Sequence, residues 1–198
     1  MSKRNIALIG ATFVSLIYGV TFTIAKDVMP GYIDAYGFIF LRVGGSALLF
    51  WGVGLMMRML KVGPNEKIAL HDFPRIVACA FFGVALNMLT FFKGLSMTSP
   101  ISAAVIMVCT PLIVLILSAI IIKEKMRKRK ILGILLGLFG TSFLILYGNS
   151  IENNSNTSWG NFLVLVNAVS YGYYLVIVKK LMDKYNAFTF VKWIYLFG

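Results

Sequence analysis

Long apolar runs alternate with short polar or basic segments along the whole chain. A helix needs about 20 mostly apolar residues to cross the hydrocarbon core of a bilayer. The pattern therefore predicts membrane-spanning helices near residues 5–25, 35–57, 76–92, 100–122, 131–147 and 159–178. A seventh run starts near Ala187 and reaches Gly198 after twelve residues, which is roughly 18 Å of helix and too short to span. We expect the sequence to stop inside its seventh helix.

The segments between the runs carry signals for helix starts and loops. Ser99 comes directly before Pro100, and Asp72 comes two residues before Pro74. Such polar side chains accept hydrogen bonds from the first free N–H groups of a helix, and proline suits the first helical turn. Both sites therefore predict capped helix starts. The polar, cation-free segment 148–158 predicts an exposed loop.

Composition places the chain in lipid rather than in water. Hydrophobic residues make up 59% of its 198 residues and charged residues 13%, against roughly 45–50% and 25% in soluble domains. A water-soluble fold could not bury that much apolar surface, so we expect an all-α integral membrane protein built as a multi-helix bundle. The formal net charge is +12, but the basic residues form short clusters and no continuous stripe. We therefore expect no nucleic-acid partner.

Lysine and arginine are distributed unevenly between alternate loops. The side that holds the N-terminus carries 15 of them and the opposite side carries two, Lys26 and Lys93, while Arg42 and Lys192 fall inside apolar runs. Cytoplasmic loops of membrane proteins are enriched in these residues. The count predicts a multi-pass protein of the inner cell membrane with its N-terminus in the cytoplasm.

An internal similarity links two of the apolar runs. YGVTFTIAKDVM (18–29) and YGYYLVIVKKLM (171–182) share Tyr, Gly, Ile, Lys and Met in register. Five predicted spans lie between the start of one copy and the start of the next. Because five is odd, the second copy would enter the membrane from the opposite face. Inverted repeats of this kind build many secondary transporters, with the substrate site near the midplane; coincidence between two apolar helices is the alternative.

Arg42 lies inside the second apolar run, about 12 Å of helix beyond Asp34. An arginine at the centre of a spanning helix costs roughly 2.5–3.5 kcal/mol, so its guanidinium is expected to face the bundle interior or a water-filled cavity. There it could attract an anionic or carboxylate-bearing solute, because its fork of donors suits planar oxyanions. It could equally hold neighbouring helices together by binding backbone carbonyls.

Polar and aromatic residues also occur inside the predicted bundle. Asn87 lies in the third run. Asn167, Tyr171 and Tyr174 share one face of the sixth run, at i, i+4 and i+7. The candidate substrate-binding residues are therefore Arg42, Asn87, Asn167, Tyr171, Tyr174 and Tyr18, the last being the repeat counterpart of Tyr171. A polar, aromatic face inside a bundle suits an amphipathic organic solute. Hydrogen bonding between helices is the alternative role.

No pattern in the chain indicates catalysis, a metal or a cofactor. Cys79 and Cys109 lie in apolar runs without metal-ligand spacing, and the single histidine, His71, lies in a loop. Without a Walker loop, any transport energy would come from ion or solute gradients. We expect no enzyme activity and no cofactor. Pro111, halfway along the fourth run, removes one backbone hydrogen bond and predicts a kink, which is either inert or lies beside a cavity.

The run TSPISAAVIMVCTPLIVLILSAIIIKEKMRKRKILGILLGLFGTSFLIL (98–146) resembles the fourth and fifth helices of the drug/metabolite transporter superfamily, EamA type. The matching features are Pro111, Glu124, Gly133 and Gly140, and Arg42 early in the second helix is similar too. The resemblance implies a ten-helix transporter made of two inverted five-helix repeats. Members often export amino acids or other small metabolites, so a small-molecule solute and membrane lipid are the expected partners.

The resemblance also implies a division of the chain. Residues 1–147 would form the first repeat, 148–158 an extracytoplasmic loop and 159–198 the start of a second repeat. The chain departs from the family pattern by stopping after six and a half helices. We expect a missing C-terminal half, with a first repeat that works with a partner chain or as a homodimer as the alternative. Competing functions are an integral-membrane lipid-modifying enzyme and a small subunit of a multi-chain transporter.

Overall fold

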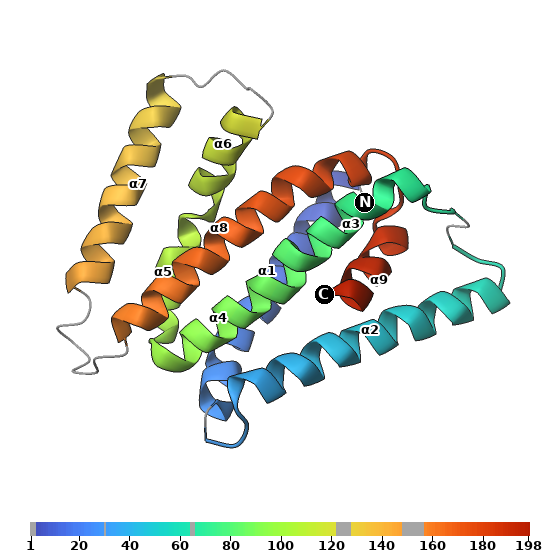
Figure 1. The fold of residues 1–198 in the computed structure, drawn as a ribbon, viewed down its shortest axis with the longest axis horizontal. Helices are drawn as coiled ribbons and strands as arrows, with labels where there is room; N and C mark the ends of the chain where they lie inside the picture. The colour runs from blue at the N-terminus through green and yellow to red at the C-terminus, as the bar shows by residue number, and fades with distance from the viewer. Residues whose placement is uncertain (1–2, 30, 64–65, 122–127, 148–156) are drawn as a thin grey trace.

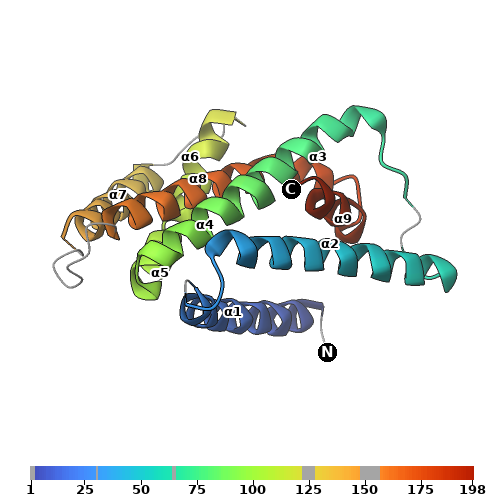
Figure 2. The same ribbon diagram turned by 60° about the horizontal axis from the view of Figure 1, so that its bottom comes forward.

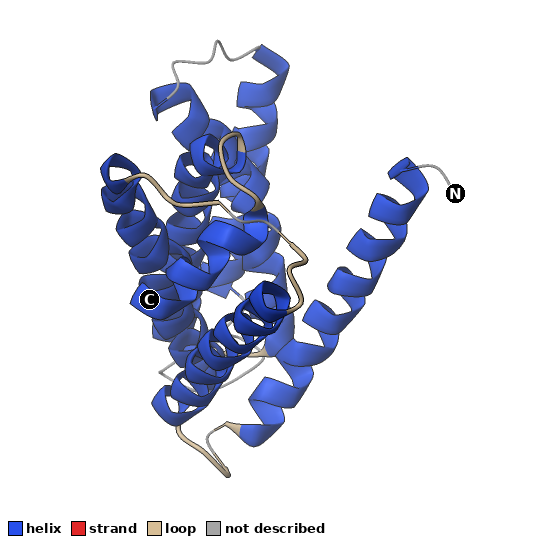
Figure 3. Ribbon diagram, turned by 90° about the vertical axis from the view of Figure 1, so that its right-hand side faces the viewer, coloured by secondary structure: helices blue, strands red, loops and turns tan. Residues whose placement is uncertain are grey.

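The computed structural model describes residues 3–29, 31–63, 66–121, 128–147 and 157–198. Helices account for most of these residues, and the described part of the chain contains no strand (Figure 3). The prediction of an all-α membrane bundle is confirmed: within the described residues, five helical segments are long and apolar enough to cross a bilayer. They are Leu8–Val28, Ala35–Met59, Leu70–Met97, Pro100–Ile121 and Thr157–Met182.

The helices begin and end close to the predicted runs, and most continue a few residues beyond them (Figure 1). In chain order they are α1 (Lys3–Val28), α2 (Ala35–Met59), η1 (Leu70–Asp72), α3 (Phe73–Ala80), η2 (Phe81–Ala85), α4 (Leu86–Met97), α5 (Pro100–Val108), α6 (Thr110–Ile121), α7 (Lys128–Tyr147), α8 (Thr157–Met182) and α9 (Ala187–Phe197). The extensions follow from the backbone, because helical hydrogen bonding does not stop where the apolar run stops. Glu124 and most of the loop at 148–158 lie outside the described residues.

Two of the spanning segments are irregular at their centres. The third changes from α-helix to one turn of π-helix at Phe81–Ala85 before it continues as α4. The fourth is divided at Cys109, two residues before Pro111, into α5 and α6. Proline carries no N–H and its ring crowds the preceding turn, which explains the break. The kink predicted at Pro111 is confirmed.

The core of the bundle forms where α8 lies along α4 and α6 (Figure 1). Small residues allow this approach: Gly94 on α4 lies against Gly160 on α8, and Gly172 on α8 lies against Ile113 on α6. Without a hydrophobic driving force between helices in lipid, close backbone packing is a main source of association. The arrangement therefore places the middle of α8 at the centre of the molecule.

α1 lies at the outer edge of the bundle and joins it near its C-terminal end (Figures 2 and 3). Ala25 and Met29 are buried there, whereas most of the described side chains earlier in the helix are exposed. Lys26 fixes this end, because its Nζ donates to the carbonyl oxygens of Leu95 and Ser96 at 3.0 Å each. A cation at the carbonyl end of α4 also interacts favourably with the helix dipole.

α2 ends in a Schellman motif with an unusual residue at its left-handed position. Val62 N–H donates to Met57 O at 2.9 Å and Lys61 N–H donates to Arg58 O at 3.2 Å, the 6→1 and 5→2 bonds of that motif. Lys61 has φ +53°. Glycine usually occupies this position, because an L-residue in the left-handed region costs roughly 1–2 kcal/mol.

One of the two predicted helix caps is confirmed and the other is wrong. Ser99 Oγ accepts a hydrogen bond from Ser102 N at 3.1 Å, as expected before Pro100. Asp72 precedes α3, but its side chain makes no cap bond. Its carboxylate instead accepts hydrogen bonds from Lys184 Nζ and Tyr185 Oη, both at 2.9 Å. Lys184 and Tyr185, in the turn between α8 and α9, therefore bind the Asp72 carboxylate in place of the nearby backbone N–H groups of α3.

Candidate functional site

A cavity of about 920 Å³, here called the central cavity, lies between α1 and α2 on one side and α5, α6 and α8 on the other, with residues of η2, α4 and α9 completing its lining. Its volume falls in the range of about 300–1,000 Å³ that is usual for small-molecule sites. Fifteen described residues line it: Val14, Ser15, Tyr18, Arg42, Gly83, Asn87, Met88, Met107, Thr110, Pro111, Val114, Leu115, Tyr171, Leu175 and Tyr195. Both irregular segments, the π-turn and the break before Pro111, therefore border it.

Arg42 reaches the central cavity from α2. Its guanidinium carbon lies 5.3 Å from the centre of the Phe92 ring, over the ring face. Within the described residues the guanidinium makes no hydrogen bond and no ion pair, so the expected clamp on backbone carbonyls has no counterpart there. A cation–π contact stabilises a charge only partly. The donor fork of Arg42 makes no hydrogen bond to the described part of the chain, and it lines the central cavity.

Asn87 and Asn167 meet beside Arg42. Asn167 Nδ2 donates to the backbone oxygen of Asn87 at 2.8 Å, a hydrogen bond between α8 and α4. The Asn167 side chain is buried, and its Oδ1 has no partner in the described structure. Arg42, Asn87 and Asn167 line a small chamber of about 50 Å³. Asn167 thus serves the interhelical role through its nitrogen, while its oxygen remains an unused acceptor.

The three candidate tyrosines do not share one role. Tyr18 on α1 and Tyr171 on α8 both line the central cavity. Tyr174 does not: its ring packs on Gly83, where an added Cβ would lie 2.6 Å from the ring, and its centre lies 5.8 Å from that of Tyr171. Tyr174 therefore lies behind the cavity wall, and the helical spacing that groups it with Tyr171 is too coarse to separate the two positions.

Sequence reasoning missed three polar residues of the central cavity, the first of which, Ser15, lies on α1. Tyr195 lies on α9, in the run that is too short to span the bilayer. Thr110, at the start of α6, has a buried Oγ1 without a partner among the described residues. Its position next to Pro111, at the start of a new helix, is the one signal that could have placed it at an irregular part of the bundle. A buried hydroxyl without a partner costs free energy.

The lining determines what the central cavity can do chemically. It contains no histidine, cysteine or carboxylate, and within the described residues no group of three or more such side chains could hold a metal ion. Arg42, Asn87 and Thr110 supply donors and acceptors, Asn167 Oδ1 adds an acceptor in the small chamber beside Arg42, and aromatic rings and methionines supply apolar contact. The arrangement can bind an amphipathic solute that carries an oxyanion and can exclude water around it.

A comparison with protein-family models finds one match. The model described as "EamA-like transporter family" matches residues 5–146. This range includes nearly all of α1, the helices from α2 to α6 and nearly all of α7, and therefore every residue that lines the central cavity outside α8 and α9. No solved structure matches the chain.

Several curated proteins resemble the chain over most of its length. "Uncharacterized transporter YyaM" of Bacillus subtilis (strain 168) is 29% identical over 182 residues, which is 91% of the chain and 57% of that protein. An "Uncharacterized transporter" of Archaeoglobus fulgidus is 27% identical over 189 residues, 96% of the chain and 62% of that protein. "Uncharacterized transporter YetK" of B. subtilis is 26% identical over 161 residues, 81% and 49% respectively. The chain thus spans about half to three-fifths of these relatives.

Proposed function

The chain belongs to the EamA-like transporter family, and from this premise we propose that it forms part of a secondary transporter that exports a small organic solute by alternating access. The observation that carries the proposal is the position of Arg42. A guanidinium that lines the central cavity and makes no hydrogen bond or ion pair to the described residues is suited to attract a charged solute to the middle of the bundle.

The residues around Arg42 favour a solute that is part anion and part apolar. Arg42 is the one charged side chain among the described residues that line the central cavity. Its planar fork matches a carboxylate better than a point charge would. Tyr18, Tyr171 and Tyr195 offer aromatic faces nearby. An amino acid or a related carboxylate-bearing metabolite fits this combination.

In many secondary transporters alternating access is a movement of two similar repeats against each other, and the two related segments support this reading. Tyr18 and Tyr171, which occupy matching positions in those segments, both line the central cavity. α1 and α8 each contain 26 residues. In the proposal, residues 1–147 form the first repeat, 148–158 the extracytoplasmic loop and 159–198 the start of a second repeat of inverted topology.

The irregular backbone at the central cavity is the proposed place of movement. The π-turn at Phe81–Ala85 and the break at Cys109 interrupt the helical ladder on two neighbouring walls. π-turns occur frequently at functional sites, and a proline break leaves the two half-helices free to change their angle. Gly83 and Pro111, which line the central cavity, would then lie where the backbone bends during the conformational change.

Orientation and assembly complete the proposal. The charge count supports a multi-pass protein of the inner cell membrane with a cytoplasmic N-terminus. Because the curated relatives are longer than the chain, we propose that a further C-terminal half supplies the remaining helices of the second repeat. A homodimer in which a second copy supplies them is the alternative assembly.

The proposal is tested by export from cells that carry the whole transporter. Cells loaded with radiolabelled amino acids should retain less label when the protein is produced, and Arg42→Gln should abolish that difference while the variant remains in the membrane. Lys180→Gln removes an exposed cation at the end of α8, away from the cavity, and should export as the parent does. Normal export by Arg42→Gln would contradict the role assigned to this residue.

The same experiment separates a carrier from a membrane enzyme. A lipid-modifying enzyme would change the lipid profile of the cells without changing solute retention. The described lining residues include neither histidine nor carboxylate, two groups that such chemistry often uses as acid or base. No observation on the described residues favours the enzyme over the carrier.

A further inference from the structure

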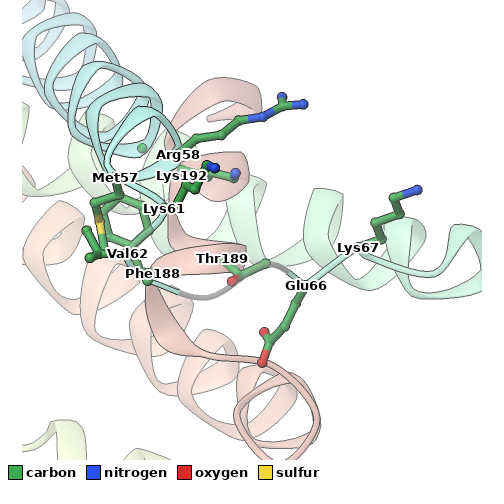
Figure 4. A pocket seen from close by; sticks show the side chains of 11 residues that line it. Met57, Arg58, Lys61, Val62, Glu66, Lys67, Phe188, Thr189 and Lys192 are labelled. Carbon is green, nitrogen blue, oxygen red and sulfur yellow. The ribbon is translucent and has the colours of Figure 1, made fainter.

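A second pocket, of about 610 Å³, lies between the C-terminal end of α2 and the first turns of α9 (Figure 4). We call it the basic pocket. Its described lining includes the charged residues Arg58, Lys61, Glu66, Lys67 and Lys192. It shares none of these residues with the central cavity, and the proposed transport path makes no use of it.

The basic pocket holds an excess of positive charge. Four cations, Arg58, Lys61, Lys67 and Lys192, line it together with one carboxylate, Glu66. Glu66 is already engaged, because its Oε2 accepts a hydrogen bond from Asn186 N at 2.8 Å and so joins the loop to the start of α9. Within the described residues none of the four cations forms an ion pair. Like charges gathered around one space repel one another unless an anion lies between them.

Lys61 provides independent evidence that the basic pocket is more than a run of loop charges. It occupies the left-handed position of the Schellman motif, with φ +53°, where glycine is the unstrained choice. Charges that only set topology need no defined backbone conformation. Here a strained residue places an ammonium group in the pocket, and residues held in such conformations cluster at ligand-binding sites.

Aromatic residues indicate the depth of the basic pocket in the membrane. Trp51 on α2 and Trp193 on α9 meet edge to face, with ring centres 5.1 Å apart. Lys192 Nζ lies 5.3 Å from the centre of the Trp51 ring, and Trp51 Nε1 donates to Lys192 O at 3.3 Å. Indole rings are enriched at the level of the lipid headgroups. The cations therefore lie where a headgroup phosphate would lie.

We propose that the basic pocket binds a phosphate group, through charge-assisted hydrogen bonds from Arg58, Lys61 and Lys192. Basic pockets between membrane helices recognise phospholipid headgroups in this way, and a guanidinium with two ammonium groups offers enough donors for the phosphate oxygens. The phosphate can belong to an anionic lipid or to a free phosphate ion. Bound there, it clamps the end of α2 to the start of α9.

Native mass spectrometry of the protein in detergent tests the lipid source. With phosphatidylglycerol and phosphatidylcholine present in equal amounts, the parent should retain phosphatidylglycerol preferentially. Arg58→Gln and Lys61→Gly should each weaken its binding about fivefold, the effect of about one juxtamembrane charge. Lys61→Arg keeps the charge and should bind as the parent does. Lys180→Gln removes an exposed cation outside the pocket and should do likewise.

Thermal unfolding tests binding of the free phosphate ion and shows whether the Lys61→Gly variant is still folded. Lys61→Gly relieves the left-handed strain, so without added ligand its melting temperature should rise by about 2–4 °C. If the occupant is the free ion, inorganic phosphate should raise the melting temperature of the parent but not that of Lys61→Gly. If the occupant is only a lipid, inorganic phosphate should change neither melting temperature. Equal binding of both ligands by the parent and Lys61→Gly would overturn the proposal. Neither readout involves transport, so the result bears on the basic pocket alone.

Discussion

Gly94 and Gly160 lie against each other's carbonyl oxygens where α4 crosses α8. A Cβ added to Gly94 would lie 2.8 Å from Gly160 O, and a Cβ added to Gly160 would lie 2.9 Å from Gly94 O. Neither obstacle is the flexible end of a side chain, so the backbones themselves would have to separate. The crossing that places α8 at the centre of the bundle therefore depends on two residues that have no side chain.

Gly94→Ala and Gly160→Ala should each destabilise the protein. Forcing an extra carbon into a closed contact typically costs about 1–3 kcal/mol, which exceeds the small gain in helix propensity from alanine. Gly45→Ala is the matched control, because nothing lies within 4 Å of a Cβ added at that position. The measurement is thermal unfolding in detergent. Equal melting temperatures for Gly94→Ala and Gly45→Ala would show that the crossing tolerates separation.

Gly83→Ala should change the central cavity through Tyr174. The new methyl group would lie 2.6 Å from the Tyr174 ring, so the ring must move and carry its neighbour Tyr171 with it. We expect transport to fall several-fold. Combining Gly83→Ala with Tyr174→Leu should restore part of it, because the ring that collides is removed. A double variant no better than Gly83→Ala would mean that the glycine is needed for the π-turn itself.

Thr110→Val should separate stability from solute binding. The substitution keeps the shape of the side chain and removes a buried hydroxyl that has no partner among the described residues. Stability should be unchanged or slightly higher, whereas a solute that bonds to this hydroxyl would lose about 1 kcal/mol, or roughly a fivefold rise in KM. Thr110→Ser keeps the hydroxyl and serves as control. A destabilised valine variant with an unaltered KM would place the hydroxyl outside the binding site.

Asp72→Asn should loosen the junction between α3 and the turn from α8 to α9. The Asp72 carboxylate is buried and accepts hydrogen bonds from Lys184 and Tyr185, while Lys184 is half-exposed and partly screened by solvent. We expect a loss of about 1–2 kcal/mol. A double-mutant cycle with Lys184→Met, followed by thermal unfolding, should show coupling between the two positions. Additive losses would indicate that the pair contributes nothing as a pair.

The positions of the helices could be predicted because the signal for a membrane span is local. A run of about 20 apolar residues identifies itself without reference to the rest of the chain. The proline break is equally local, since Pro111 lacks its N–H wherever the chain folds. Arg42 was identifiable for a similar reason: a charge inside an apolar run needs a polar surrounding, and the central cavity supplies it.

Features that depend on two distant segments were not predictable. Asp72 looked like a helix cap, because nothing in the sequence shows that Lys184 approaches it. Tyr174 and Tyr171 share a helix face, yet only the contact with Gly83 shows that one of them lies behind the wall. The π-turn at Phe81–Ala85 has no residue signature comparable to proline. The left-handed backbone at Lys61 was not predictable either, because a lysine in the sequence does not indicate a position that glycine usually occupies.

The anchoring of Lys26 affects how the molecule responds to voltage. Lys26 is bonded to two carbonyls at the end of α4, and Lys93, the other cation of the sparsely charged face, lies 5.4 Å from the centre of the Tyr36 ring. Both cations are thus held by contacts with the protein. An electric field across the bilayer does work of about 2.3 kcal/mol per charge moved through 100 mV. Held in this way, neither ammonium group can move through such a field by itself, so a force on these charges is passed to α1 and α4 as whole helices.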